Sequence, residues 1–161
     1  MQDDYQNILV PVDGSESAER AFEKALKIAT ENSAHLDLLN VIDTRQFMGD
    51  VQDSLIGGDT IYQLTQDAET YLKNLIDYAH QNAGFDNIDY HIRYGNPKRV
   101  ISKDFIDDHH NDLTIIGTTG LNAIERMLMG SVTEYVNQHS ASDVLIVRTD
   151  LDNKKISRKN K

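Results

Sequence analysis

The fold is decided near the amino terminus by the stretch Asn7-Ile-Leu-Val-Pro-Val-Asp-Gly-Ser15. Its apolar residues follow one another without polar interruption, which is typical of a strand buried on both faces in a parallel sheet. Asp13 and Gly14 are turn residues, and Ser15 is a suitable N-cap for the apolar helical pattern that runs on to Ala29. The stretch therefore predicts a buried strand, a tight turn and an amphipathic helix.

Four more segments predict strands further along the chain. The apolar runs at 35–41, 113–116 and 144–147 have the same character as the first strand. The segment 88–94 differs because it alternates apolar and polar residues, which is typical of a half-exposed or edge strand.

Helical patterns separate these strands. One begins near Asp59 as cap and ends before Gly84, which suits the C′ position of a helix. Another opens with Asn96 as N-cap and Pro97 as the first helical residue. The segment Ser131-Val-Thr-Glu134 has the form of a capping box and predicts a helix that begins there.

Strands and helices therefore alternate, which predicts an α/β fold: a Rossmann-like α/β/α sandwich with a five-stranded parallel sheet and helices on both faces. We expect one domain over residues 1–149 and a basic, disordered tail over 150–161. The stretch Asp43–Gly58 has no clear pattern and ends in two glycines, so it is predicted to be a flexible flap. Ligands of such sheets bind beyond the carboxyl ends of the strands.

Composition excludes several classes of protein. The 161 residues contain no cysteine, which excludes disulfides, thiolate metal sites and a cysteine nucleophile. The net charge is −10, and residues 151–161 contribute +4, so the rest of the chain carries −14. Such acidity argues against nucleic acid and anionic membranes as partners. The amino terminus is acidic, which argues against a signal peptide, and no apolar run is long enough to span a membrane. We therefore expect a cytoplasmic protein.

The chemistry of the chain is concentrated in the spacing G-x2-G-x9-G-S, formed by Gly117, Gly120, Gly130 and Ser131. It runs from the end of a strand to the first turn of a helix. Glycines allow a backbone to approach a ligand closely or to take a positive φ, and a helix N-terminus attracts anions. The group therefore either cradles phosphates or consists of ordinary turn glycines followed by an N-cap serine. Neither a P-loop nor a dinucleotide-binding G-x-G-x-x-G motif is present.

Together with the first strand, Ser131-Val-Thr-Glu134 and the closing Val144-Leu-Ile-Val-Arg148, this spacing resembles the universal stress protein (UspA) family over residues 5–149. The glycine pattern resembles that of the ATP-binding members. The resemblance implies a sheet order of 3-2-1-4-5, an ATP ligand (or ADP or AMP), and a role in stress response or regulation. It also implies a homodimer in which the last strand, Asp143 to Arg148, pairs across a twofold axis. Because the chain is acidic, we expect Mg²⁺ to accompany the nucleotide and neutralise part of its charge.

The resemblance further implies a set of nucleotide-binding residues. They are Pro11, Val12 and Asp13 beside adenine and ribose, Val41 against the adenine ring, and Gly117, Gly120, Gly130, Ser131 and Val132 around ribose and phosphates. Many ATP-binding members carry a basic or imidazole side chain between the first two glycines. Here Thr119 offers a hydrogen bond without charge, which puts phosphate affinity in question.

Other candidate residues favour simpler interpretations. Arg126 either reaches a phosphate or is a solvated loop charge, and the second is favoured. His109 and His110 beside Asp107 and Asp108 are interpreted as a solvated helix end and not a metal site, and the remaining histidines as isolated.

No catalytic residue is predicted, so hydrolysis should be slow or absent. Two alternatives remain: a nucleotide-free dimeric interaction module, and an enzyme of the adenine-nucleotide α-hydrolase group. The second lacks the expected Ser-Gly-Gly-x-Asp-Ser loop, because residues 13–17 are Asp-Gly-Ser-Glu-Ser.

Overall fold

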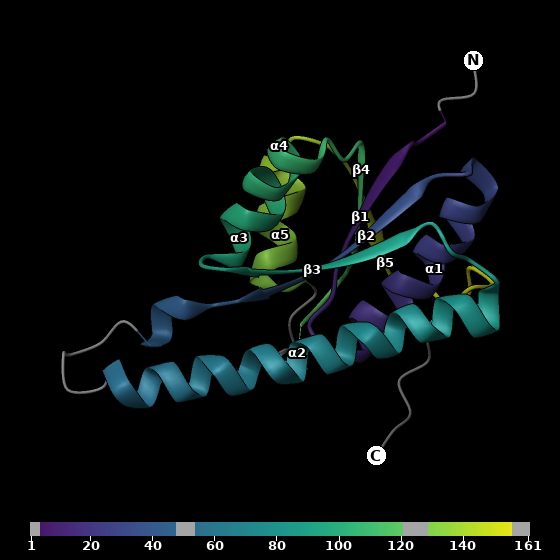
Figure 1. Ribbon diagram of the computed structural model, residues 1–161. Helices are drawn as coiled ribbons and strands as arrows, with labels where there is room; N and C mark the ends of the chain where they lie inside the picture. Colours follow the sequence, from purple (N-terminus) through teal and green to yellow (C-terminus); the bar gives the residue numbers. More distant parts are fainter. Residues whose placement is uncertain (1–3, 48–53, 121–128, 156–161) are drawn as a thin grey trace.

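The computed structural model describes residues 4–47, 54–120 and 129–155. They form a five-stranded, all-parallel sheet in the order β3-β2-β1-β4-β5. Helices α1 and α2 cover one face of the sheet, and α3, α4 and α5 cover the other (Figure 1). The predicted fold class and strand order are confirmed. In the described part of the chain, no helix is long and apolar enough to cross a membrane.

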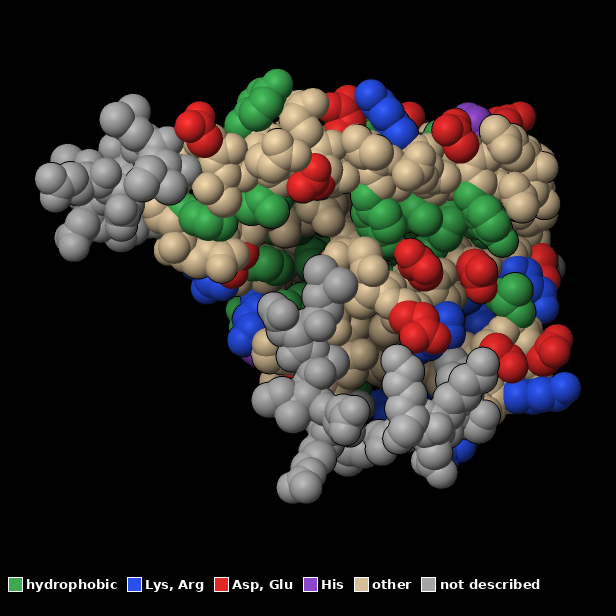
Figure 2. Space-filling view, turned by 90° about the horizontal axis from the view of Figure 1, so that it is seen from below, with side chains coloured by type: hydrophobic (Ala, Val, Ile, Leu, Met, Phe, Trp, Pro, Cys, Tyr) green, Lys and Arg blue, Asp and Glu red, His purple; other side chains and the backbone are tan. Residues whose placement is uncertain are grey.

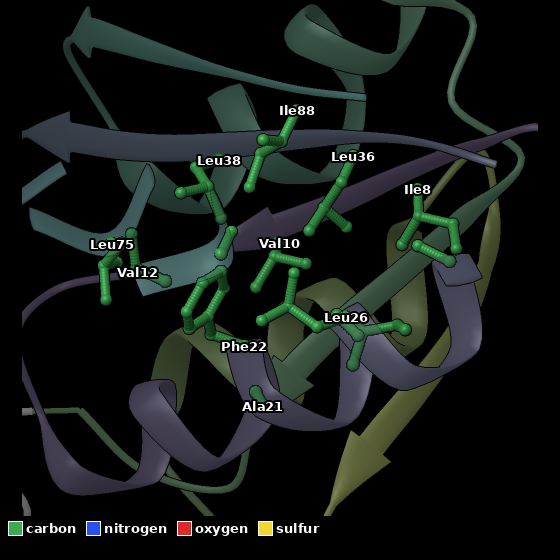
Figure 3. Packing of buried hydrophobic residues seen from close by; sticks show 14 of the residues in the cluster. Ile8, Val10, Val12, Ala21, Phe22, Leu26, Leu36, Leu38, Leu75 and Ile88 are labelled. Carbon is green, nitrogen blue, oxygen red and sulfur yellow. The ribbon is translucent and has the colours of Figure 1, made fainter. Parts of the chain in front are cut away.

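The central strand β1 (Asn7–Pro11) holds the two layers together. Ile8 and Val10 point into the cluster beneath α1, where Figure 3 shows Val10 above Phe22 and Leu26. Leu9 points to the other face and packs in the cluster under α4 and α5. Each such side chain contributes about 1.5–3 kcal/mol when fully buried, so both helix layers depend on this strand.

Helix α1 (Glu16–Asn32) begins as predicted. The Ser15 hydroxyl accepts a hydrogen bond from the Ala18 amide at 3.1 Å, which confirms Ser15 as the N-cap. The chain continues into β2 (His35–Ile42) and a short 3₁₀ turn, η1 (Thr44–Phe47).

Helix α2 (Ser54–Ala83) is longer than predicted. Asp59 is not its cap but lies inside it, and the predicted flap Asp43–Gly58 has helical turns at both ends, while residues 48–53 lie outside the described part. The two glycines caused the error, because Gly57 and Gly58 are helical despite a cost of about 1 kcal/mol each. Gly84, with φ +60°, follows the helix as predicted.

The second half of the chain follows the predicted order. Strand β3 (Ile88–Tyr94) is an edge strand, and the Asn96 side chain caps the next helix by accepting from the Lys98 amide at 3.1 Å. That helix consists of α3 (Pro97–Arg99), a π-helical turn η2 (Val100–Asp104) and α4 (Phe105–His109). Strand β4 (Leu113–Gly117), helix α5 (Ser131–His139) and strand β5 (Asp143–Val147) complete the fold.

The basic tail begins with an ordered turn. Thr149 pairs with Lys155, and Lys24 of α1 donates to the Asp150 carbonyl at 3.0 Å and to Asn153 Oδ1 at 2.7 Å. Residues 150–155 of the predicted disordered tail thus contact α1, and residues 156–161 lie outside the described part.

Candidate functional site

A cleft of about 730 Å³ opens at the carboxyl ends of β1 and β4, where the strand order changes direction. Figure 2 views the molecule from the α2 side and shows a hollow bordered by apolar side chains. All ten residues predicted to bind a nucleotide line this cleft: Pro11, Val12, Asp13, Val41, Gly117, Thr119, Gly120, Gly130, Ser131 and Val132. Its volume is typical of small-molecule sites.

Gly117 and Gly120 owe their place in the cleft to nearby atoms and not to their backbone conformation. A Cβ on Gly117 would lie 2.5 Å from Ser17 Oγ and 2.6 Å from the Ser17 carbonyl oxygen, so Gly117 lets α1 pack against β4. A Cβ on Gly120 would lie 2.7 Å from Asp13 Oδ2, inside the cleft. Neither has a positive φ, which among the described glycines occurs at positions 14, 84 and 95. The possibility that these glycines take a positive φ is therefore wrong.

Three hydrogen bonds connect the described residues that follow β4 to α1 and α5. The Thr119 amide donates to Ser17 Oγ at 3.3 Å, and the Gly130 amide donates to the Thr118 carbonyl at 2.7 Å. The Thr133 hydroxyl donates to the Gly117 carbonyl at 2.8 Å. These bonds join the end of β4, the adjoining Thr118 and Thr119, and the start of α5. The sequence analysis missed Ser17 and Thr133, although both lie in the first turn of a predicted helix.

The N-terminus of α5 faces the cleft without a side-chain cap. Gly130, in extended conformation, is the N-cap and forms no side-chain hydrogen bond, while Ser131 is the first helical residue. The predicted capping box is therefore wrong by one residue, because the bond from Gly130 to Thr118 fixes the chain ahead of Ser131. The first helical N–H groups and the partial positive charge of the helix end are directed at any anion in the cleft.

Helix α2 supplies a wall of the cleft that the sequence analysis missed. Leu64, Ala68 and Tyr71 line it at helical spacing, which is the signal that would have identified them. The Tyr71 hydroxyl is buried beside the Gly14 backbone. Burial and the carboxylates of Glu19 and Asp13 raise the pKa of Tyr71 to about 12. At neutral pH its hydroxyl is therefore a protonated donor.

The described lining of the cleft is acidic. Asp13, Asp43 and Asp67 line it, and none of the described lining residues is lysine or arginine. A guanidinium nitrogen of Arg45 lies 2.6 Å from Oδ2 of Asp43, and the hydrogen bond from Arg45 holds the pKa of the Asp43 carboxyl below its usual value. Arg126, considered as a phosphate contact, lies outside the described residues. In the described part, main-chain N–H groups and hydroxyls are thus the donors for an anion.

A second polar cluster lies on the face covered by α4, around Asp37 in the amino-terminal half of β2. His91 of β3 and Asn111 contact the Asp37 carboxylate at 2.7 and 2.8 Å. The prediction that His91 is isolated is therefore wrong, and His109 is half-buried and stacked on Phe105 instead of being a solvated helix end. Burial opposes ionisation of Asp37, but the hydrogen bonds from His91 and Asn111 outweigh it and lower its pKa.

Comparison with known proteins places this geometry among characterised folds. The model of the universal stress protein family matches residues 4–148. A putative universal stress protein of Staphylococcus epidermidis is 40% identical over 150 residues, which cover 91% of this chain and 86% of that relative. The solved universal stress protein UspA from Lactobacillus plantarum is 31% identical with a TM-score of 0.82, over 89% of this chain and 98% of that one. A universal stress protein solved in complex with cAMP is 28% identical with a TM-score of 0.60, over 90% and 98% of the two chains.

Proposed function

The chain belongs to the universal stress protein family, and from that membership we propose that it binds an adenine nucleotide in the cleft between β1 and β4. The ligand is ATP, or ADP or AMP, accompanied by Mg²⁺. Binding serves stress response or regulation, and hydrolysis is slow or absent.

The observation that carries the proposal is the N-terminus of α5, which has no side-chain cap and lies at the cleft beside glycines that lack a side chain. Unpaired helical N–H groups are a recurrent phosphate-binding device. Tyr71 also lines the cleft, and its hydroxyl, protonated at neutral pH, supplies a further hydrogen-bond donor for a polar ligand. The relative solved with cAMP supports adenine as the base.

The predicted residues divide between the nucleoside and the phosphates in this proposal. The exposed Asp13 carboxylate accepts from a ribose hydroxyl, while Val12 and Val41 pack against adenine. The backbone around Gly120 and Gly130, the first amides of α5 and the Ser131 and Thr119 hydroxyls surround the phosphates. Gly117 contributes by letting α1 bring Ser17 to the loop.

The same residues explain why hydrolysis should be slow. Phosphoryl transfer is accelerated by cationic side chains on the transferred group and by a group that orients the attacking water. The described lining offers no lysine or arginine for the first task. Binding without rapid turnover suits a protein whose nucleotide state is a signal.

Affinity for ATP is expected to depend strongly on Mg²⁺. Asp13, Asp43 and Asp67 repel a free tetra-anion, and a bound divalent ion removes half of its charge. Titration calorimetry of the nucleotide-free protein should therefore show at least about tenfold weaker binding in EDTA, or 1.4 kcal/mol. Equal affinity in both buffers would contradict the electrostatic part of the proposal. Absence of binding in either would favour a nucleotide-free interaction module.

We further propose that β5 pairs with the β5 of a second copy. It is an edge strand whose Leu145 is 37% exposed and flanked by the partly buried Val144 and Ile146, and an apolar edge needs covering.

Leu145→Asp should convert the dimer to a monomer, as measured by light scattering, because it places a charge in the paired edge. Leu151→Asp is the matched control, since Leu151 is an exposed leucine outside β5 and its replacement should leave the dimer intact. A wild-type chain that is monomeric, or a Leu145→Asp variant that stays dimeric, would exclude this interface.

A further inference from the structure

The polar cluster around Asp37 brings together three side chains with metal-binding atoms. One carboxylate oxygen of Asp37 and one ring nitrogen each of His91 and His109 all lie within 4.8 Å of one another. Asp37 is only 3% exposed, and the two histidines are half-buried. The three residues come from β2, β3 and the end of α4, so the fold and not the sequence assembles them.

The donor set has a clear chemical preference. Two imidazoles and one carboxylate are the ligands of zinc and of neighbouring first-row ions, whereas Mg²⁺ and Ca²⁺ favour oxygen ligands. A carboxylate and neutral imidazoles are the forms that bind metal.

We propose that Asp37, His91 and His109 bind one Zn²⁺ ion that fastens the edge strand β3 and helix α4 to β2. This site lies apart from the nucleotide cleft, because none of its three residues lines that cleft. The ion takes the place of the direct hydrogen bond between His91 Nε2 and Asp37 Oδ1, now 2.7 Å long. His35, whose Nε2 lies 3.3 Å from the same oxygen, remains beside the carboxylate.

The surroundings already orient the three ligands. Asn111, only 4% exposed, donates from Nδ2 to the second oxygen of Asp37 at 2.8 Å, which leaves Oδ1 of Asp37 for the ion. The Phe105 ring stacks on His109 with centroids 4.0 Å apart and meets His91 edge-on at 5.0 Å. Outer contacts of this kind fix the orientation of metal-bound side chains.

Arg93 is the group that competes with the ion. Its guanidinium lies 3.3 Å from His109 Nε2 and 3.2 Å from Asp108. When zinc binds, Arg93 keeps the partner Asp108 and gives up His109. Removal of the Arg93 charge should therefore strengthen zinc binding. If the cluster is only a hydrogen-bond network, the same change should not increase the affinity for zinc.

The test is a calorimetric titration of the full-length, nucleotide-free protein with Zn²⁺ after removal of metals by a chelator. We expect one Zn²⁺ per chain, with excess Mg²⁺ failing to compete. Zinc at about 100 times its dissociation constant should raise the melting temperature by roughly 5–10 °C. Titration with Co²⁺ should give the visible absorption of a bound ion.

Three variants decide between a metal site and a hydrogen-bond network. His109→Gln should weaken zinc binding by about 100-fold, because even outer partners of a metal typically contribute 10- to 100-fold. His110→Asn is the matched control: it changes the adjacent, exposed histidine, whose φ of 57° suits asparagine, and should bind like the wild type. Arg93→Gln should bind more tightly. Circular dichroism verifies that each variant is folded.

The proposal is overturned by a wild-type chain that takes up no stoichiometric Zn²⁺, or by equal affinities of the wild type and His109→Gln. Loss of binding in His110→Asn to the same extent as in His109→Gln would also overturn it. Because these measurements use no nucleotide, their outcome is independent of the nucleotide proposal.

Discussion

Replacement of Gly117 by alanine is expected to lower the free energy of unfolding by about 3 kcal/mol, near the upper end of the usual range for overpacked cores. The new methyl group would lie 2.6 Å from the Ser17 carbonyl oxygen and 2.7 Å from its carbon, which belong to the backbone of α1. Helix α1 must therefore shift away from β4. Thermal unfolding should show a melting temperature lower by roughly 6–12 °C.

Gly58→Ala is the matched control for this substitution. A Cβ on Gly58 meets no atom within 4 Å, and the residue lies within α2. Alanine there should stabilise the protein by about 0.5–1 kcal/mol, since glycine is a poor helix former. A Gly117→Ala variant that unfolds at the wild-type temperature would show that α1 does not approach β4 as closely as described.

Replacement of Gly120 by valine should abolish nucleotide binding without loss of the fold. A Cβ on Gly120 falls 2.7 Å from Asp13 Oδ2, which is the far end of a side chain that can rotate away. The Asp13 carboxylate then moves out of the position in which it would accept from the ribose, and the valine side chain occupies space in the cleft. We expect at least about a 100-fold loss of affinity, or 2.7 kcal/mol.

Titration calorimetry and circular dichroism together separate the possible roles of Gly120. An unchanged spectrum with lost binding supports a ligand role. An unfolded variant would assign Gly120 to the fold, and unchanged affinity would remove it from the site. Gly58→Ala again serves as control, because Gly58 does not line the cleft.

These two glycines illustrate how far the sequence alone could lead. The strands and the capping residues Ser15 and Asn96 follow from local patterns, the order of the strands in the sheet follows from the family resemblance, and the structure confirms all of them. The spacing of the glycines identified the cleft, but it could not show that Gly117 serves the packing of α1 whereas Gly120 borders the ligand site. Only the approach of α1 distinguishes them, because that approach depends on contacts between segments far apart in the chain.

The errors have the same origin. The start of α2 was placed at Asp59 because local propensity counts glycines as helix breakers, whereas tertiary contacts override it. The cluster of Asp37, His91 and His109 was missed because its members lie on three different elements, and no short motif joins them. Patterns along the chain thus predict elements and their order, and side-chain clusters depend on packing.

The central claim is that the cleft between β1 and β4 binds an adenine nucleotide, and titration of the nucleotide-free protein with Mg-ATP tests it most directly. The account predicts saturable binding of one nucleotide per chain, with GTP and CTP much weaker. Absence of measurable binding at millimolar Mg-ATP by a folded protein would contradict it.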